Sequence, residues 1–80
     1  MIYPNPFDDL IHVELESALE TDIYIEIYNA LGQIVFSRPY SLSFGINAIN
    51  IEVSHLASGT YHIKVINGID EALLKKMVKS

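Results

Sequence analysis

One short stretch of this chain carries three side chains of the types that bind metal ions. His12, Glu14 and Glu16 occupy every second position, and in an extended strand this spacing places them on one face. An imidazole with two carboxylates is a ligand set for zinc or copper. A solvated strand face gives the same pattern, because charged residues discourage edge-to-edge pairing of sheets. No second histidine stands at a metal-site spacing from these residues, so we favour the solvated face and expect neither a metal nor a cofactor.

Two further groups could suggest catalysis or calcium binding. Asp8 and Asp9 follow a proline-containing turn but lack the regular spacing of oxygen ligands found in calcium loops. Ser54 directly precedes His55, yet neighbouring side chains of an extended chain point apart, and a nucleophile must meet its base in space. We therefore interpret these residues as parts of solvated turns, and we predict that the chain is not an enzyme.

The composition indicates one small, acidic, globular domain over residues 1–80. Half of the residues are hydrophobic and 19% are charged, a balance that favours a folded core over disorder. The chain has no cysteine, so no disulfide or thiolate zinc site stabilises it. A net charge of −5 disfavours a nucleic-acid partner, since phosphate binding needs a basic surface. The apolar runs are too short to span a bilayer, and the first residues do not form a signal-peptide pattern.

Alternating hydrophobic residues predict strands along most of the chain. In residues 22–36, isoleucines at every second position alternate with tyrosines and a glutamate, and residues 29–32 then break the run at Gly32. This stretch is expected to be a central β-hairpin. The same period predicts inward-facing positions in four strands: Ile11, Val13 and Leu15; Ile23, Ile25 and Ile27; Ile49, Ile51 and Val53; and Tyr61, Ile63 and Val65.

Two other stretches give a less regular pattern. Pro39 cannot donate a hydrogen bond to a sheet, so we expect it to interrupt pairing and to lie at an edge or a bulge. Asn67 and Gly68 predict a hairpin turn before the last strand, residues 71–79. The inward face of that last strand stays open, because both parities carry apolar residues and a lysine. The number and spacing of these strands predict an all-β fold, a small antiparallel β-sandwich of about seven strands, with an immunoglobulin-like arrangement as the default.

Four pieces of the sequence carry a resemblance to a known family. They are Y-P-N-P-F at residues 3–7, Y-N-A-L-G-Q-I-V at 28–35, L-A-S-G-T-Y-H-I-K-V at 56–65 and K-K-M-V-K at 75–79. In this order they resemble the C-terminal sorting domain (type A) of cargo proteins of the type IX secretion system (Por secretion system) of Bacteroidetes-type bacteria. The resemblance covers essentially the whole chain and implies a compact seven-stranded sandwich at the end of a longer secreted protein.

The resemblance implies a secretion signal and several partners. The parent protein is expected to cross the inner membrane by a separate amino-terminal signal, to be recognised in the periplasm by the outer-membrane machinery, and to reach the cell surface or the extracellular space. A sortase-like surface peptidase is then expected to remove the domain. Met1 is expected to be a start codon added to a fragment excised from the parent. We expect no membrane insertion and a monomer, with dimerisation through edge strands as the alternative.

The charge pattern, combined with the family resemblance, predicts where the machinery binds. Three of the five basic residues lie in the last six positions, and basic side chains on an edge strand steer it towards an acidic receptor. The strand could also add to a partner sheet, or its lysines could simply protect an exposed edge from aggregation. The predicted recognition residues are Gly59, Thr60, Tyr61, Lys75, Lys76, Val78 and Lys79. The resemblance marks a second set as scaffold: Tyr3, Pro4, Asn5, Pro6, Gly32 and Gly59.

Two binding functions are the alternatives. A carbohydrate-binding module of a secreted enzyme would need a planar row of exposed aromatic rings, for which Tyr24, Tyr28 and Tyr40 are the candidates. The absence of tryptophan makes this alternative weaker. An adhesion module or spacer would instead occur in tandem copies and would not need a terminal position.

Overall fold

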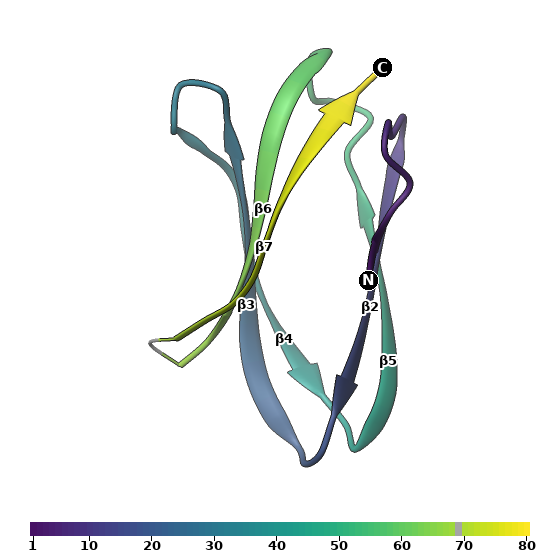
Figure 1. Ribbon diagram of the computed structural model, residues 1–80, viewed down its shortest axis with the longest axis vertical. Helices are drawn as coiled ribbons and strands as arrows, with labels where there is room; N and C mark the ends of the chain where they lie inside the picture. The colour runs from purple at the N-terminus through teal and green to yellow at the C-terminus, as the bar shows by residue number, and fades with distance from the viewer. Residues whose placement is uncertain (69) are drawn as a thin grey trace.

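The computed structural model describes residues 1–68 and 70–80, and the regular structure within them is β-strand. The strands pair antiparallel in two sheets that pack face to face (Figure 1). One sheet has the order β1-β2-β5 and the other the order β4-β3-β6-β7. The strands are β1 Ile2–Tyr3, β2 Leu10–Ser17, β3 Thr21–Asn29, β4 Ile34–Leu42, β5 Gly45–Glu52, β6 Gly59–Asn67 and β7 Asp70–Lys79. None of the described residues forms a helix with the length and hydrophobicity needed to cross a membrane.

The connections between the strands follow a Greek-key pattern. β3 and β4 form one hairpin and β6 and β7 another, whereas β5 lies in the opposite sheet and β6 returns to pair with β3. The predicted antiparallel sandwich is thereby confirmed. In constant-type immunoglobulin domains the fourth strand joins the sheet of the fifth. Here β4 pairs with β3 instead, which gives a division into three and four strands.

Alternating side chains fill the space between the sheets, as the sequence predicts. Ile23, Ile25 and Ile27 of β3 are at most 3% exposed, and Ile11 and Val13 of β2 face them almost fully buried. Each such side chain contributes about 1.5–3 kcal/mol when it leaves water, so the strand period determines which face of each sheet lies inside. The other predicted inward positions are buried (Ile51, Val53, Tyr61, Ile63 and Val65) or partly buried against the core (Leu15 and Ile49).

A polar turn closes the central hairpin between β3 and β4. The Asn29 side-chain oxygen accepts hydrogen bonds from the backbone N–H groups of Leu31 and Gln33, both at 3.0 Å. Gly32 adopts φ = 82°, a conformation that side chains with a Cβ rarely tolerate. The predicted turn at residues 29–32 is therefore confirmed, and asparagine and glycine are the residues that make it.

The expected interruption at Pro39 is wrong. β4 continues through this residue, which pairs with Tyr24 of β3. β4 is the outermost strand of its sheet, and an edge strand needs hydrogen bonds on one side only, so proline is tolerated there. The expectation that Pro39 lies at an edge is confirmed.

A tyrosine near the start of β6 anchors the loop that precedes it. Tyr61 is 6% exposed, and its hydroxyl donates a 2.6 Å hydrogen bond to the backbone carbonyl of Ala57. A tyrosine at this corner that bonds upstream backbone is a recurring feature of β-sandwich domains. The contact fixes how the chain enters β6, the strand that pairs with β7.

Candidate functional site

Five of the seven predicted recognition residues lie together at one end of the β6–β7 hairpin, and the other two, Lys75 and Lys76, lie further along β7. The strand register pairs Gly59 with Lys79, Thr60 with Val78 and Tyr61 with Met77. Two segments that are distant in the sequence therefore meet, with Thr60 and Val78 on the outer face and Tyr61 and Lys79 buried.

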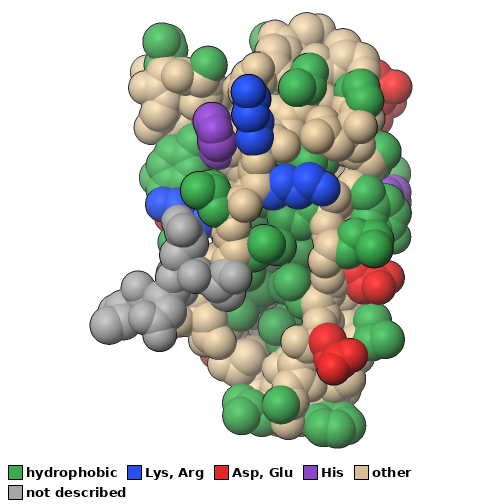
Figure 2. All heavy atoms as spheres, in the orientation of Figure 1, with side chains coloured by type: hydrophobic (Ala, Val, Ile, Leu, Met, Phe, Trp, Pro, Cys, Tyr) green, Lys and Arg blue, Asp and Glu red, His purple; other side chains and the backbone are tan. Residues whose placement is uncertain are grey.

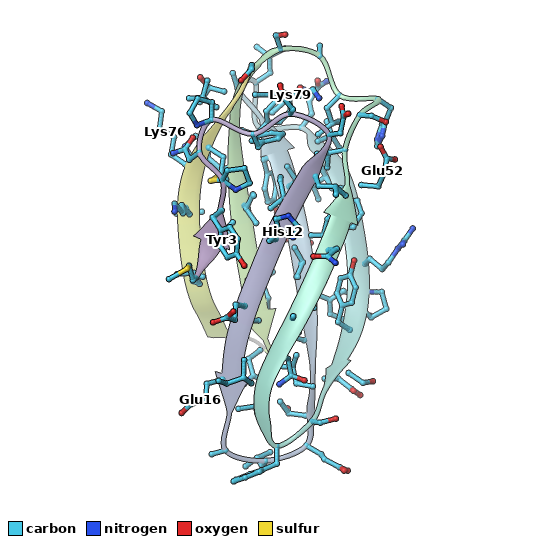
Figure 3. The ribbon with its side chains drawn as sticks, turned by 90° about the vertical axis from the view of Figure 1, so that its right-hand side faces the viewer. Tyr3, His12, Glu16, Glu52, Lys76 and Lys79 are labelled. Atoms are coloured by element: carbon cyan, nitrogen blue, oxygen red, sulfur yellow. The ribbon has the colours of Figure 1, made fainter. Side chains whose placement is uncertain are left out.

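The structure also assigns the inward face of β7, which the sequence left open. Met77 is fully buried and Lys79 is 8% exposed, so odd-numbered residues face the interior. Val78 is 41% exposed and Lys76 is exposed, so even-numbered residues face outwards. Lys75 shares the inward parity and is half-buried. Two of the three lysines near the end of the chain thus point into the sandwich, and Lys76 points away from it (Figure 3).

The buried ammonium group of Lys79 is surrounded by oxygen atoms and one aromatic ring. Its Nζ donates hydrogen bonds to the backbone carbonyls of Asp8, at 2.6 Å, and Val53, at 3.2 Å. The ring of Phe7 lies 5.8 Å from the same nitrogen, within the range of a cation–π contact. The aliphatic stem packs inside while the charge reaches polar groups at the end of the sandwich.

Lys75 makes a comparable contact halfway along the same strand. Its Nζ donates a 2.7 Å hydrogen bond to the carbonyl of Ile2 in β1. β1 is the edge strand of the three-stranded sheet and β7 the edge strand of the four-stranded sheet. Figure 2 shows basic side chains on this face, one of which extends from the four-stranded sheet towards the other sheet. Lys75 therefore connects the two sheets, and its charge is not presented outwards in the way that the sequence analysis assumed.

A segment before β2 covers the end of β7. We call residues 4–9 the amino-terminal strap. Within it, the Phe7 N–H donates to the Val78 carbonyl at 2.9 Å, and the Phe7 carbonyl accepts from the Ser80 N–H at 2.9 Å. The Asn5 side-chain oxygen accepts from the Val78 N–H at 3.0 Å. The strap thus adds a short stretch of parallel pairing to the free edge of β7.

Phe7 is the important residue that the sequence analysis left outside the predicted site. It is fully buried and makes an edge-to-face contact with Tyr61, with ring centroids 6.0 Å apart. The sequence feature that could have identified Phe7 is an aromatic residue in an otherwise polar, proline-containing turn. Tyr3, by contrast, is 40% exposed and stacks on His12, with the ring centroids 5.3 Å apart (Figure 3).

The scaffold residues are spread over the fold, with Tyr3 in β1. Pro4, Asn5 and Pro6 belong to the strap, where both X–Pro peptide bonds are cis. Gly59 begins β6 with φ = 150°. Gly32 lies in the β3–β4 turn. It also lines a shallow groove on the outer face of the four-stranded sheet.

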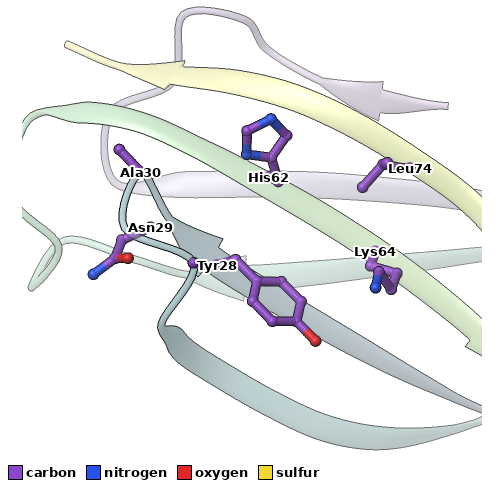
Figure 4. Close-up of a pocket in the computed structure, with 7 residues that line it drawn as sticks. Tyr28, Asn29, Ala30, His62, Lys64 and Leu74 are labelled. Carbon is purple, nitrogen blue, oxygen red and sulfur yellow. The ribbon is translucent and has the colours of Figure 1, made fainter.

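This groove has a volume of about 340 Å³ and adjoins the outward face of β7 (Figure 4). His62, Lys64 and Leu74 point into it from β6 and β7. Lys64 also lies 5.1 Å from the ring of Tyr28. The remaining lining residues are Tyr28, Asn29, Ala30 and Gly32. The groove offers apolar contact beside nitrogen donors, the combination of a binding surface.

Two of the residues considered for metal binding or catalysis, His12 and Ser54, have other partners. The Nδ1 atom of His12 lies 2.5 Å from the Asn50 side-chain oxygen. Among residues 1–68 and 70–80, no three His, Cys, Asp or Glu side chains cluster as a metal site would require. The Ser54 hydroxyl donates to the Glu52 carboxylate, and this bond, with a second from the Ser54 backbone N–H, lowers the pKa of Glu52 below its ordinary value.

The aromatic row needed for carbohydrate binding is not formed. Tyr24 and Tyr28 lie on the outer face of the four-stranded sheet, and the Tyr28 hydroxyl donates to Glu26 at 2.7 Å. Tyr40 pairs with the inward-facing Ile23 and packs against the core. Because Tyr40 has the opposite orientation, the three rings do not form one stacking platform.

Comparison with known protein families gives one match. A family model described as "Secretion system C-terminal sorting domain" matches residues 1–80, the whole chain. Searches of curated proteins and of solved structures gave no match.

Proposed function

Because the chain belongs to the family of secretion system C-terminal sorting domains, we propose that the paired ends of β6 and β7 are the part that the secretion machinery contacts. The domain is a C-terminal sorting signal of type IX secretion, which directs an attached cargo protein to the cell surface or the extracellular space. Its function implies interaction with the type IX machinery. The family is not an enzymatic one, and we assign the chain no catalytic activity of its own.

One observation carries this proposal. The β6–β7 register places Thr60, Lys76 and Val78 side by side on one outer face. These residues come from two of the sequence pieces that carry the family resemblance. Lys76 is the basic residue of the last strand that points outwards, and an exposed charge accelerates association with a partner of opposite sign.

The remaining steps complete the proposal. The cargo passes through the periplasm, where the outer-membrane machinery recognises this domain, and a sortase-like peptidase removes it at the cell surface. The domain acts as a single unit, residues 1–80, excised from a longer protein, and as a monomer.

The experiment that tests the recognition surface uses a secreted reporter fused to this domain in a competent bacterium. Deleting the last strand would remove the fully buried Met77 and unfold the domain, so point substitutions are sharper. We expect Lys76→Glu with Val78→Ser to reduce export by about tenfold, equivalent to about 1.4 kcal/mol of lost binding. The circular dichroism spectrum and the melting temperature of the purified domain should stay close to those of the wild type.

Glu14→Lys is the matched control. It changes the charge by the same magnitude, with the opposite sign, on the outer face of the other sheet, where Glu14 is exposed. We expect normal export for this variant. Normal export of the folded Lys76→Glu/Val78→Ser variant would contradict the proposed surface.

A further inference from the structure

The end of β7 does not present a free strand edge. The N–H and C=O groups of Val78 both point away from β6, and they bond to Asn5 and Phe7 of the strap at 3.0 Å and 2.9 Å. The Ser80 N–H is also taken, by the Phe7 carbonyl. A partner that binds by strand addition uses these same backbone groups. At this end of the hairpin, a partner can add a strand only after displacing the strap.

Side chains reinforce the contact between the strap and β7. Phe7 is fully buried beneath the end of the sandwich. Lys79 reaches from β7 to the Asp8 carbonyl, and Lys75 reaches from β7 to Ile2, just before the strap. The strap is thus held by backbone bonds on the edge of β7 and by the Lys79 ammonium group from its inner face, while Lys75 holds β1 just before it. The strap leaves the outer face of β7 uncovered.

That outer face has a defined chemical character. Lys76 lies between Leu74, 51% exposed, and Val78, 41% exposed, and pairs with His62 of β6. A positive charge between two exposed aliphatic side chains is complementary to a carboxylate with apolar neighbours. The chain as a whole is acidic, with a net charge of −5. The positive charge on this face is therefore a local exception, and it favours an acidic partner at this place on the surface.

We propose that the amino-terminal strap is a positioning element of the sorting signal: it closes the edge of β7 and holds the outer face so that an acidic, partly apolar protein surface of the secretion machinery docks on that face. This inference rests on the proposed recognition of the β6–β7 hairpin. It adds the mode of binding, which is contact with the face and not strand addition to the edge. The two modes predict opposite effects of loosening the strap.

The test uses Asn5→Ala and Asn5→Asp in the reporter fusion and in the purified chain. Alanine removes the acceptor of the Val78 N–H, whereas aspartate restores an acceptor oxygen at the same place. We expect Asn5→Ala to accelerate hydrogen exchange of the Val78 amide by roughly tenfold, as one local hydrogen bond is lost. The exchange of the Ile63 amide, in the core strand β6, should not change. Export should fall about tenfold with alanine, and aspartate should restore both export and slow exchange.

A control separates positioning from simple destabilisation. Ile49→Val removes one methylene from a partly buried position of β5, in the sheet away from the hairpin. It lowers the melting temperature of the domain, and we expect it to leave export normal. If Asn5→Ala reduces export although it lowers the melting temperature no more than Ile49→Val does, the loss of export is due to the strap and not to destabilisation.

Three results would overturn the inference. Increased export of Asn5→Ala would mean that the machinery uses the strand edge, and unchanged export with faster Val78 exchange would mean that the strap is not part of the signal. Unchanged Val78 exchange would show that Asn5 does not hold the edge. Failure of the proposed function has a separate signature, since the Lys76→Glu/Val78→Ser variant would then export normally.

Discussion

At the scale of single residues, identical side chains near the end of the chain have different environments. Lys75 and Lys79 donate to backbone carbonyls inside the sandwich, and Lys76 is exposed to solvent. The difference follows from strand parity, because neighbouring residues of a strand face opposite sides. A cluster of lysines in a sequence therefore does not translate directly into a cluster of surface charge.

A serine and a glutamate at the end of β5 form a contact that depends on pH. The Ser54 hydroxyl and backbone N–H both bond the Glu52 carboxylate and lower the pKa of Glu52. A lowered pKa in the folded state stabilises the fold above the ordinary pKa of glutamate, and this contribution disappears as the pH falls through the folded-state pKa.

We therefore expect Ser54→Ala to lower the melting temperature at neutral pH. The difference from the wild type should stay constant down to about pH 5 and shrink as the pH falls further, since the reference pKa of glutamate is about 4.3 and the folded-state pKa of Glu52 is lower. Thermal melts across this pH range measure the effect, which is small because Glu52 is fully exposed. Ser37→Ala, an exposed substitution on β4, should follow the wild-type profile. A Ser54→Ala difference that does not shrink as the pH falls below the reference pKa of glutamate would exclude the carboxylate as its origin.

At the scale of elements, the sequence predicted the strands whose two faces differ in polarity. β2, β3, β5 and β6 alternate clearly, so their inward residues could be assigned from the period of two. β7 could not be assigned in this way, because Leu74 and Val78 on its outer face are as apolar as Leu73 and Met77 on its inner face. Its register is determined by distant carbonyl partners of Lys75 and Lys79, which no local pattern reveals.

β4 shows a second limit of local patterns. A proline predicts that a strand is not central, but not whether the strand ends there. Pro39 lies within a continuous strand because β4 has one neighbour. Edge position is a property of the assembled sheet, so the sequence alone could not decide between an edge strand and a break.

The start of β6 depends on the backbone freedom of one glycine. Gly59 has φ = 150°, which residues with a Cβ rarely adopt, although no atom lies within 4 Å of the position of a Cβ there. The effect of a substitution is therefore a matter of backbone strain and not of a clash.

We expect Gly59→Val to lower the free energy of unfolding by about 1–3 kcal/mol, which for a domain of this size lowers the melting temperature by about 4–8 °C per kcal/mol. Differential scanning calorimetry measures the change. Thr60→Val, the next position along β6, is the matched control and should have a small effect, because Thr60 does not have a positive φ. An unshifted melting temperature for Gly59→Val would contradict the inferred strain.

At the scale of the whole molecule, the fold class could be predicted, but the contacts that join the amino-terminal strap to β7 could not. Strand count, turn residues and period are local properties, and they led to the sandwich. The joining of the strap to β7 involves residues 71 and 73 positions apart. The candidate site could therefore be located at the end of the last strand, but its division into an inner and an outer face required the structure.

The same contacts give a prediction about stability. Lys79→Met keeps the aliphatic stem and removes the ammonium group, which leaves the carbonyls of Asp8 and Val53 without this donor. We expect a loss of about 1–2 kcal/mol in the free energy of unfolding, because unpaired polar groups at the end of the core are unfavourable. Urea denaturation measures it.

Lys76→Met is the internal comparison for that measurement. Its side chain is exposed and lies three positions earlier on the same strand, so its removal should change stability by no more than about 0.5 kcal/mol. Equal effects of the two substitutions would contradict the different environments of these lysines. Together, the two substitutions separate the lysine that holds the fold from the exposed lysine that we propose for partner recognition.

The distance along the chain between the strap and the last strand has a consequence for biosynthesis. Contacts that join residues 73 positions apart form after the contacts within hairpins, because long loops are slower and less favourable to close. During translation, the strap emerges from the ribosome long before its partner strand exists. The sorting signal thus acquires its final form only when nearly all of the domain has been made, and a nascent or truncated chain does not yet display it.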